Sequence, residues 1–330
     1  MKQDPSLLSI SSKLLFEEAS KRGIKSIFFD KFTVEMKKKS KNWFIRGSLN
    51  SFQSAVGRTI AKKKELAKTI LNYHSIPQAN CQVIKTLDNL TKINKLNFPL
   101  VLKPSQGTQG KNVFVGINNM NETKKKIQEL YLDDENFAIF EEMLQGKEYR
   151  ILCIDFKFVA AAYRTPANII GDGKHTIQKL IEIKNQHPWR GEGHQSPLTK
   201  IAVDQEVINN LKEIELNLDS VPEKDQQVFL RKVGNLSQGG EAINVTHLVS
   251  EANQQLFEKI ARVTDLNVIG IDVMCQSLET PIINQQNAGI IEINAAPGLR
   301  MHHFPMQGDS INAAGLILDM IENEFKKRGQ

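Results

Sequence analysis

Residues 290–301 read Ile-Ile-Glu-Ile-Asn-Ala-Ala-Pro-Gly-Leu-Arg-Met. The stretch begins with an apolar run that two side chains with oxygen atoms interrupt, Glu292 and Asn294. The β-branched residues at its start predict a buried strand. Because side chains alternate across a strand, Ile291 and Ile293 are expected to face one way, and Glu292 and Asn294 the other. A carboxylate and an amide oxygen on one strand face suit a hard cation such as Mg²⁺.

A third oxygen ligand is available upstream. The apolar run Val268–Met274 is interrupted by a single acid, Asp272. A lone acid in a strand is more often a strand-end residue or a paired core residue than a metal ligand. If the two strands are neighbours, however, Asp272, Glu292 and Asn294 form the ligand set expected for Mg²⁺ ions that bridge nucleotide phosphates.

A second nucleotide signal lies in residues 98–111, Phe-Pro-Leu-Val-Leu-Lys-Pro-Ser-Gln-Gly-Thr-Gln-Gly-Lys. Residues 100–102 predict a short buried strand that delivers Lys103, a point charge suited to a phosphate oxygen. Small residues in the following loop would let backbone N–H groups approach phosphates: Ser105, Gly107 and Gly110. The spacing matches neither a Walker A loop nor G-x-G-x-x-G, so an ordinary hairpin turn explains this segment equally well on its own.

The third segment is residues 138–150, Ala-Ile-Phe-Glu-Glu-Met-Leu-Gln-Gly-Lys-Glu-Tyr-Arg. It predicts a strand that ends in two acids, a turn at Gly146, and a second strand that carries Glu148 and Arg150.

These three segments, in this order, resemble the ATP-grasp superfamily. The resemblance implies an α/β (α+β) fold in which two α+β lobes grip ATP, preceded by a short α/β pre-ATP-grasp lobe. The expected lobes are residues 1–60 for the reduced N-terminal lobe, 61–140 for the small lobe with a flexible Gly loop, and 141–330 for the large lobe with the metal site. The implied cofactors are ATP and Mg²⁺, with two ions expected and Mn²⁺ as the alternative ion.

The resemblance also implies roles for individual residues. Phosphates would be bound by Lys103, by the loop of Ser105, Gly107 and Gly110, and by Lys64, whose neighbours Lys62 and Lys63 leave the register open. The hinge that reads adenine through its backbone would be Glu141, Glu142, Met143 and Leu144, and the ribose would be bound by Glu148. The metal ligands would be Asp272, Glu292 and Asn294.

Three further segments narrow the resemblance: 164–179, 231–240 and 295–302 are similar to the ATP-grasp module of cyanophycin synthetases. The glutathione synthetase half of bifunctional glutamate–cysteine ligase fusions is similar but more distant. Cyanophycin synthetases also carry an N-terminal domain and a Mur-ligase-like module, which do not fit in this chain. We therefore expect half of that chemistry at most, with one type of amide bond formed.

The implied reaction is an ADP-forming carboxylate–amine ligation through an acylphosphate. Arg231 and Asn235 match positions that support the reacting phosphate or intermediate. Arg300 and Arg164 are candidates to clamp a substrate carboxylate, because arginine forms bidentate pairs. A surface ion pair is the alternative for each arginine. We assign no residue as a catalytic base, since positioning and electrostatics dominate such chemistry.

Two alternatives remain open: another amide-forming ligase, of the glutathione-synthetase-like or other dipeptide type, and a non-catalytic ATP-binding regulatory protein. The intact metal triad and both lysines argue against the second. The sequence fixes neither the acid nor the amine, and it leaves a homo-oligomer open.

Composition sets the remaining bounds. The 330 residues are 40% hydrophobic and 24% charged, as in ordinary globular proteins. The net charge is +6, but the four Tyr and two Trp do not interleave with the lysine clusters, so we predict small-molecule or peptide substrates and no nucleic acid. Three separated cysteines indicate a reducing compartment. With no signal-peptide pattern and no apolar span, the prediction is a cytoplasmic protein without membrane contact.

Overall fold

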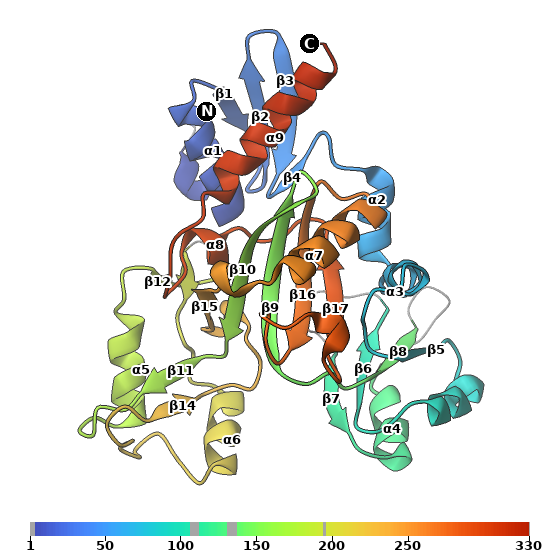
Figure 1. Cartoon of the computed structure of the whole chain (residues 1–330). Coiled ribbons are helices and arrows are strands. Elements are labelled where there is room, and N and C mark those ends of the chain that lie inside the picture. The colour runs from blue at the N-terminus through green and yellow to red at the C-terminus, as the bar shows by residue number, and fades with distance from the viewer. Residues whose placement is uncertain (1–3, 106–111, 131–136, 194–195, 330) are drawn as a thin grey trace. The chain divides into compact units, whose positions relative to one another are not determined.

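The computed structural model describes residues 4–105, 112–130, 137–193 and 196–329. The chain forms two compact units, each assembled from separate stretches (Figure 1). Unit 1 comprises Met1–Phe52, Val159–His247 and Ala296–Gln330, and unit 2 comprises Gln53–Phe158 and Leu248–Ala295. Both units combine helices and strands, which confirms the expected mixed class. The expected division into three lobes stays a prediction.

Unit 2 contains a four-stranded antiparallel sheet in the order β5-β8-β6-β7. Its strands are β5 (Cys81–Ile84), β6 (Leu100–Pro104), β7 (Phe114–Ile117) and β8 (Ala138–Glu142). One face buries alternate apolar residues, including Leu100, Leu102 and Phe140, in a core that also contains Ile93 and Ile127. Residues between them in the sequence therefore point to the opposite face.

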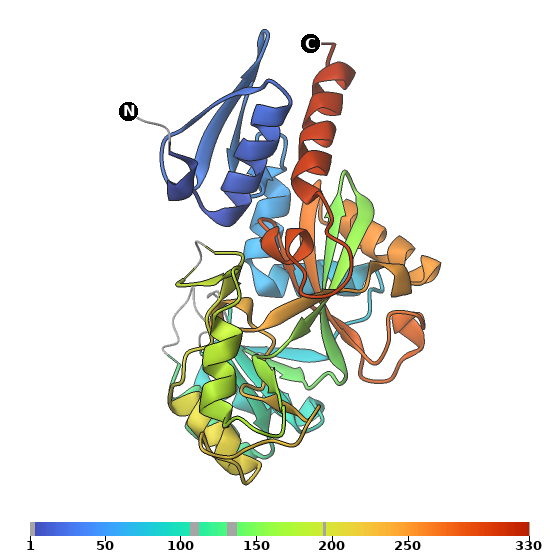
Figure 2. The same ribbon diagram turned by 90° about the vertical axis from the view of Figure 1, so that its left-hand side faces the viewer.

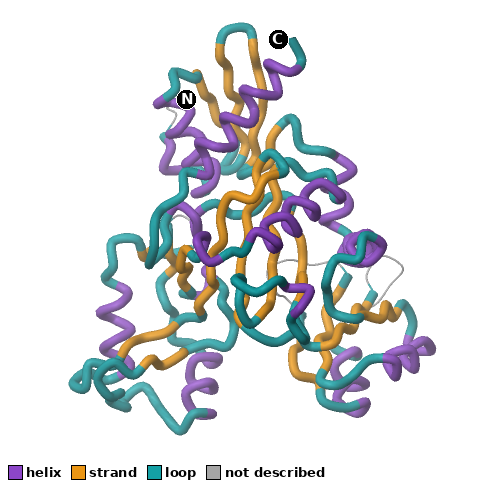
Figure 3. Tube along the Cα trace, viewed as in Figure 1, coloured by secondary structure: helices purple, strands orange, loops and turns teal. Residues whose placement is uncertain are grey.

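The second set of strands in unit 2 consists of β9 (Lys147–Ile154), β16 (Val268–Cys275) and β17 (Gly289–Asn294). Strand β16 lies in the middle and pairs antiparallel with both neighbours. These strands are the long central ones in Figure 3. Most of β16 is buried, so its β-branched sequence reflects burial on both faces.

Helices complete unit 2. They are α2 (Ala55–Lys62), α3 (Lys64–Tyr73), α4 (Met120–Ile127) and α7 (Glu251–Val263), with the 3₁₀ segments η2 (Leu87–Lys95) and η5 (Ile282–Asn284). Helix α7 packs on β9 and β16 (Figure 1). Gly57 allows α2 to approach the end of α7, because a Cβ atom at this position would lie 2.5 Å from the Asp265 carbonyl oxygen.

Unit 1 begins with η1 (Pro5–Leu7), α1 (Ile10–Lys21) and an antiparallel sheet in the order β1-β2-β3-β4. The strands are β1 (Lys25–Phe28), β2 (Thr33–Lys38), β3 (Lys41–Arg46) and β4 (Leu49–Asn50). The C-terminal helix α9 (Ala313–Lys327) packs beside α1 (Figure 2). The aromatic ring of Trp43 lies 5.5 Å from that of Phe325, so the two ends of the chain share one core.

The rest of unit 1 comprises residues 159–247 and the segment from residue 296 to α9; two of its elements, β10 and η4, extend by one or two residues beyond these bounds. Its strands are β10 (Lys157–Thr165), β11 (Asn168–Ile170), β12 (Arg190–Gly191), β13 (Leu198–Thr199), β14 (Gln227–Phe229) and β15 (Glu241–Asn244). Its helical segments are α5 (Ile177–Asn185), α6 (Gln205–Glu213), η3 (Leu236–Gln238), η4 (Thr246–Leu248) and α8 (Arg300–His303). An apolar core that includes Ile169, Leu180 and Leu211 holds β11, α5, α6 and β14 together.

The structure differs from sequence-based expectation at one informative place. Strand β17 carries a bulge: Asp272 lies opposite Glu292, but Val273 lies opposite Ile290, which leaves Ile291 without a register partner on β16. Ile291 is therefore only half-buried, and the strict alternation predicted from Ile291 to Asn294 is wrong at its first residue.

Candidate nucleotide and metal site

The strand register of unit 2 collects the three predicted metal ligands. Asp272 in the middle strand lies directly opposite Glu292 on β17. Asn294 lies two residues further along β17, and its Nδ2 atom is 3.3 Å from Asp272 Oδ2 and 3.4 Å from Glu292 Oε1. Glu292 and Asn294 therefore share a face beyond the bulge, and the three side chains form one polar cluster.

Arg150 on β9 completes this cluster, although the sequence analysis assigned it no role. It lies opposite Asp272 and binds both of its carboxylate oxygens, with an Nη2–Oδ2 distance of 2.9 Å. Burial disfavours the charged guanidinium, but the carboxylates of Asp272, Glu292 and Glu148 raise the pKa of Arg150 above its ordinary value. The signal in the sequence was its place two residues after Glu148, on the same face of a strand.

Within this cluster, Glu292 is the carboxyl group whose charged form is disfavoured by its surroundings. Burial raises the pKa of its carboxyl group, and the neighbouring carboxylate of Asp272 raises this pKa further, while Arg150 and Lys103 lower it. A cation between the two carboxylates would remove this penalty. Among the described residues, no group of three or more His, Cys, Asp or Glu side chains could hold a metal ion, so Asn294 is needed as the third ligand. The residues present fit an oxygen-liganded divalent cation.

A buried cluster of lysines surrounds Glu141 of β8 in the same unit. The Nζ atom of Lys103, on β6, is 2.5 Å from Glu141 Oε1. The Nζ atom of Lys68, on α3, is 3.1 Å from the same oxygen. All three side chains are at most 8% exposed. Burial lowers the pKa of Lys68, and the negative charge of Glu141 opposes this effect.

Lys64 lies at the first position of α3 and reaches the end of β6. Its Nζ atom donates to the carbonyl oxygen of Pro104 at 3.3 Å. Burial lowers the pKa of Lys64, the carboxylates of Glu292 and Glu141 raise it, and Lys103 lowers it further. Lys64 therefore lies within electrostatic range of both the acidic cluster and the lysine cluster.

The loop after Lys103 is described only at its start. Ser105 is buried; its amide donates to the Phe137 carbonyl oxygen at 2.7 Å, and its hydroxyl accepts from the Phe137 amide at 3.0 Å. Gly107 and Gly110 lie outside the described residues.

The predicted hinge, residues 141–144, connects β8 to the turn before β9. The Glu142 carboxylate accepts hydrogen bonds from Asn80 Nδ2 at 2.8 Å and from the Asn97 amide at 2.9 Å. The amide of Met143 donates to the carbonyl oxygen of Pro99 at 3.2 Å, so this group is already engaged within the protein. Any reading of a base by this segment would use its other backbone groups, including those of half-buried Leu144.

Glu148, the predicted ribose ligand, is the second residue of β9, the strand that carries Arg150. It is half-buried, lies opposite Met274 of β16, and interacts electrostatically with Arg150. Glu148 therefore belongs to the same strand face as the acidic cluster.

The predicted catalytic and substrate residues lie in unit 1. Arg231 is buried, and its guanidinium forms ion pairs with Asp204, at 2.5 Å, and with Glu206. Both acids lie at the N-terminal end of α6. Arg231 is therefore already paired with carboxylates, 25 and 27 positions away in the sequence.

Three other predicted residues lie close to one another in unit 1. Arg164 Nε donates to the Gly234 carbonyl oxygen at 2.8 Å, and Asn235 Oδ1 caps η3 by accepting from the Ser237 amide. Met301, which follows Arg300 in α8, shares a small apolar cluster with Leu236. This packing holds α8 beside the segment that contains Asn235.

Arg300 differs from the other arginines of unit 1. Burial alone lowers the pKa of its guanidinium. Its Nη1 atom is buried and has no hydrogen-bond partner among the residues that the structure describes. A half-buried cation in this state is suited to an anionic ligand.

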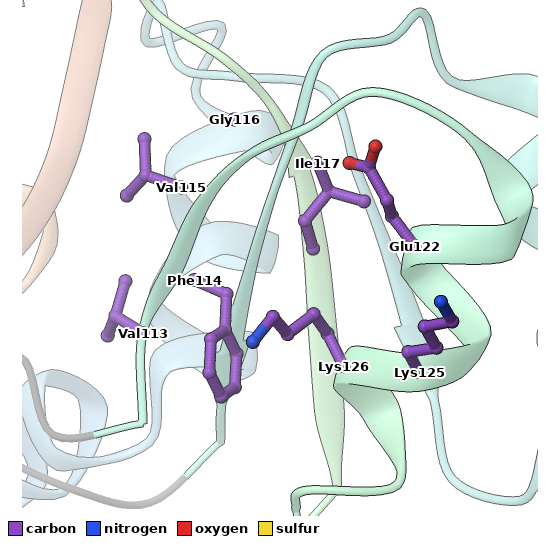
Figure 4. Close-up of a pocket in the computed structure, with 8 residues that line it drawn as sticks. All are labelled: Val113, Phe114, Val115, Gly116, Ile117, Glu122, Lys125 and Lys126. Carbon is purple, nitrogen blue, oxygen red and sulfur yellow. The ribbon is translucent and has the colours of Figure 1, made fainter. Parts of the chain in front are cut away.

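A hollow of about 400 Å³ lies elsewhere in unit 2, between β7 and α4 (Figure 4). Lys126 and Phe114 both line the hollow, and the ammonium group of Lys126 lies 4.8 Å from the centre of the Phe114 ring. None of the predicted site residues lines this hollow, so we do not assign it to the site.

Comparison with known proteins supports the same interpretation. Residues 62–164 match the family model described as phosphoribosylglycinamide synthetase, ATP-grasp (A) domain. The chain is 36% identical over 280 residues to a cyanophycin synthetase from Crocosphaera subtropica, covering 84% of this chain and 32% of that protein. It is 29% identical over 323 residues to a bifunctional glutathione biosynthesis protein from Clostridium perfringens, covering 96% of this chain and 41% of that protein.

Among solved structures, a bifunctional glutathione synthetase from Pasteurella multocida superimposes with a TM-score of 0.76 at 28% identity, covering 98% of this chain and 44% of that one. The chain thus spans about a third to two fifths of the length of the curated relatives it matches. Within the described part of the chain, every helix is too short or too polar to cross a membrane. The sequence matches and the shared fold confirm the predicted resemblance of this chain to the ATP-grasp superfamily.

Proposed function

We propose that this chain is an ADP-forming carboxylate–amine ligase. In the proposed reaction, a substrate carboxylate attacks the γ-phosphorus of ATP, ADP leaves, and an acylphosphate forms. An amine then attacks the acyl carbon, phosphate leaves, and an amide bond is made. The product would be an amide or peptide built on an amino-acid-like or peptide acid.

The observation that carries the proposal is the charge pattern of unit 2. Lys64, Lys68 and Lys103 gather around one carboxylate, Glu141, and so present an excess of positive charge in a buried place. The acidic cluster of Asp272 and Glu292 lies within electrostatic range of Lys64 and Lys103. Cations beside oxygen ligands are the surroundings that a metal–triphosphate needs.

Asp272, Glu292 and Asn294 would hold Mg²⁺, with two ions expected and Mn²⁺ as a possible substitute. When bound, the metal neutralises negative charge on the phosphoryl group that is transferred. The chain's own contribution is positional: Arg150 fixes Asp272 through two hydrogen bonds, and Lys64 and Lys103 provide fixed positive charge. Glu148 would bind the ribose, and the backbone of residues 141–144 the adenine.

We infer that the acid substrate is recognised in unit 1. The half-buried guanidinium of Arg300, with a buried Nη1 that lacks a partner among the described residues, supports recognition of a carboxylate there. Arg164 and Asn235 would support this site, and Arg231 would act on the phosphate or intermediate only if a ligand displaced its acidic partners. The three-lobe division at residues 60 and 140 and a cytoplasmic location remain part of the proposal.

A single experiment separates the candidate functions. The purified chain is mixed with Mg²⁺-ATP and a pool of amino acids and dipeptides, while ADP release is followed by a coupled assay and products by mass spectrometry. A ligase gives ADP, phosphate and a new amide in equal amounts. A glutathione-synthetase-like enzyme would require a thiol dipeptide acid, and a regulatory protein would bind ATP without turnover. AMP and pyrophosphate as products would refute the proposal.

A further inference from the structure

The lysine cluster contains one more ammonium group than the phosphate-binding role predicts. The sequence assigned Lys64 and Lys103 to the nucleotide phosphates, whereas Lys68 had no role. In the structure, Lys68 and Lys103 approach the same atom, Oε1 of Glu141, at 3.1 Å and 2.5 Å. Lys68 comes from α3 and Lys103 from β6, so two separate elements deliver their charges to one carboxylate oxygen.

The net charge of Lys103, Glu141 and Lys68 indicates what the ammonium group of Lys68 contributes. Without Lys68, Lys103 and Glu141 would form a closed neutral pair at close contact in a poorly hydrated place. In such a place the attraction between opposite charges is strong, so Glu141 would neutralise the charge of Lys103 and leave none for a ligand. With Lys68 on the same oxygen, the trio keeps one net positive charge.

The side chain of Lys68 lies in the interior of unit 2. Its side chain is 7% exposed, on the buried face of α3 between Ala67 and Leu71. Its carbonyl oxygen accepts a hydrogen bond from Gln78 Nε2 at 2.8 Å. Gln78 in turn forms a bridge with Ile290 at the start of the strand that carries Glu292. The main chain of Lys68 is therefore connected through Gln78 to β17, the strand of the predicted metal ligands, while its side chain lies beside Glu141.

We propose that Lys68 is a positioning residue of the nucleotide site: its ammonium neutralises Glu141 and thereby leaves the charge of Lys103 available to the phosphates of ATP. This inference rests on the proposed function, because it takes ATP as the ligand of Lys103. Lys68 acts through Glu141, and its effect on ATP binding depends on the negative charge of that residue.

The test is a double-mutant cycle on ATP binding, measured by isothermal titration calorimetry without acid or amine, so that no turnover is needed. The variants are Lys68→Met, Glu141→Gln, the double variant, and Lys92→Met, which removes an exposed lysine of the same unit as a control. Lys68→Met is expected to weaken ATP binding about ten- to hundredfold. In the Glu141→Gln background the same change is expected to weaken binding by less than about threefold, because no carboxylate is left to capture Lys103.

The outcomes discriminate. If Lys68→Met weakens binding equally in both backgrounds, Lys68 contacts the nucleotide directly and the inference is overturned. If it has no more effect than Lys92→Met, the inference is also overturned. Lys68→Arg keeps the charge and is expected to bind ATP within about threefold of the parent chain, which tests the same point if Lys68→Met does not fold. If the parent chain binds no ATP at all, it is the proposed function that fails.

Discussion

Replacing Arg150 by methionine tests whether the acidic cluster depends on an internal cation. The Arg150 side chain is 11% exposed and that of Asp272 is 4% exposed, so the pair is screened from water. The substitution replaces the guanidinium by an apolar side chain, so Asp272 still lies opposite Glu292 on β17 but has no cation opposite it on β9. Removing one partner of a buried ion pair costs about 3–5 kcal/mol of unfolding free energy.

The expected result is a fall in melting temperature of about 10 °C, since 1 kcal/mol corresponds to about 2–4 °C in proteins of 150–250 residues. Scanning calorimetry in EDTA measures this fall directly. Mg²⁺ should restore part of the lost stability, because a bound cation would take over the neutralisation of both carboxylates.

The matched control is Arg262→Met, which breaks an exposed pair with Glu258 on α7 of the same unit. Exposed helix pairs contribute less than about 1 kcal/mol, so this variant should melt within about 3 °C of the parent chain. Equal melting temperatures for the two variants would refute the reasoning, because Arg150 would then hold no more than a surface pair.

Four further predictions follow from the same geometry. Gly146→Ala should destabilise unit 2 by about 1–3 kcal/mol in chemical denaturation, because Gly146 has φ of +118° and an added Cβ would lie 2.4 Å from the Cys275 carbonyl oxygen. Glu292→Ala should lower ADP release at least about hundredfold in the coupled assay, with an unchanged circular dichroism spectrum. Arg300→Ala should raise KM for the acid about tenfold or more while KM for ATP stays nearly constant; equal changes would contradict acid recognition. Burial raises the pKa of Cys275 to about 12, so at pH 8 this group is a neutral thiol, and peptide mapping after iodoacetamide treatment should find half-buried Cys81 modified first.

The acidic cluster was the most predictable part of the site. Glu292 and Asn294 stand two residues apart at the end of an apolar run, so period-2 alternation places them on one strand face, and the resemblance to ATP-grasp proteins added Asp272, which interrupts another apolar run. Alternation could not reveal the bulge at Ile291, because a bulge depends on the pairing with β16 and not on the residues of β17 alone.

The missed residues share one physical reason. The roles of the charges on Lys68 and Arg150 depend on ion-pair partners that are far away in the sequence, Glu141 and Asp272. The same holds for Arg231, for which the resemblance implied a role at the reacting phosphate or intermediate, whereas the fold sets two carboxylates from the start of α6 against it. Local patterns indicate where a charge stands on an element, but not which charge the tertiary fold sets against it.

The unbroken register between β9 and β16 has a consequence for how this protein acquires its site. Eight consecutive residue pairs, from Val268 opposite Ile154 to Cys275 opposite Lys147, match without a shift. A slip by one residue would turn Arg150 to the face opposite Asp272 and leave buried carboxylates unanswered. The wrong alignment is thus disfavoured by electrostatics as well as by lost packing, so the charged residues favour the correct register when β9 and β16 pair during folding.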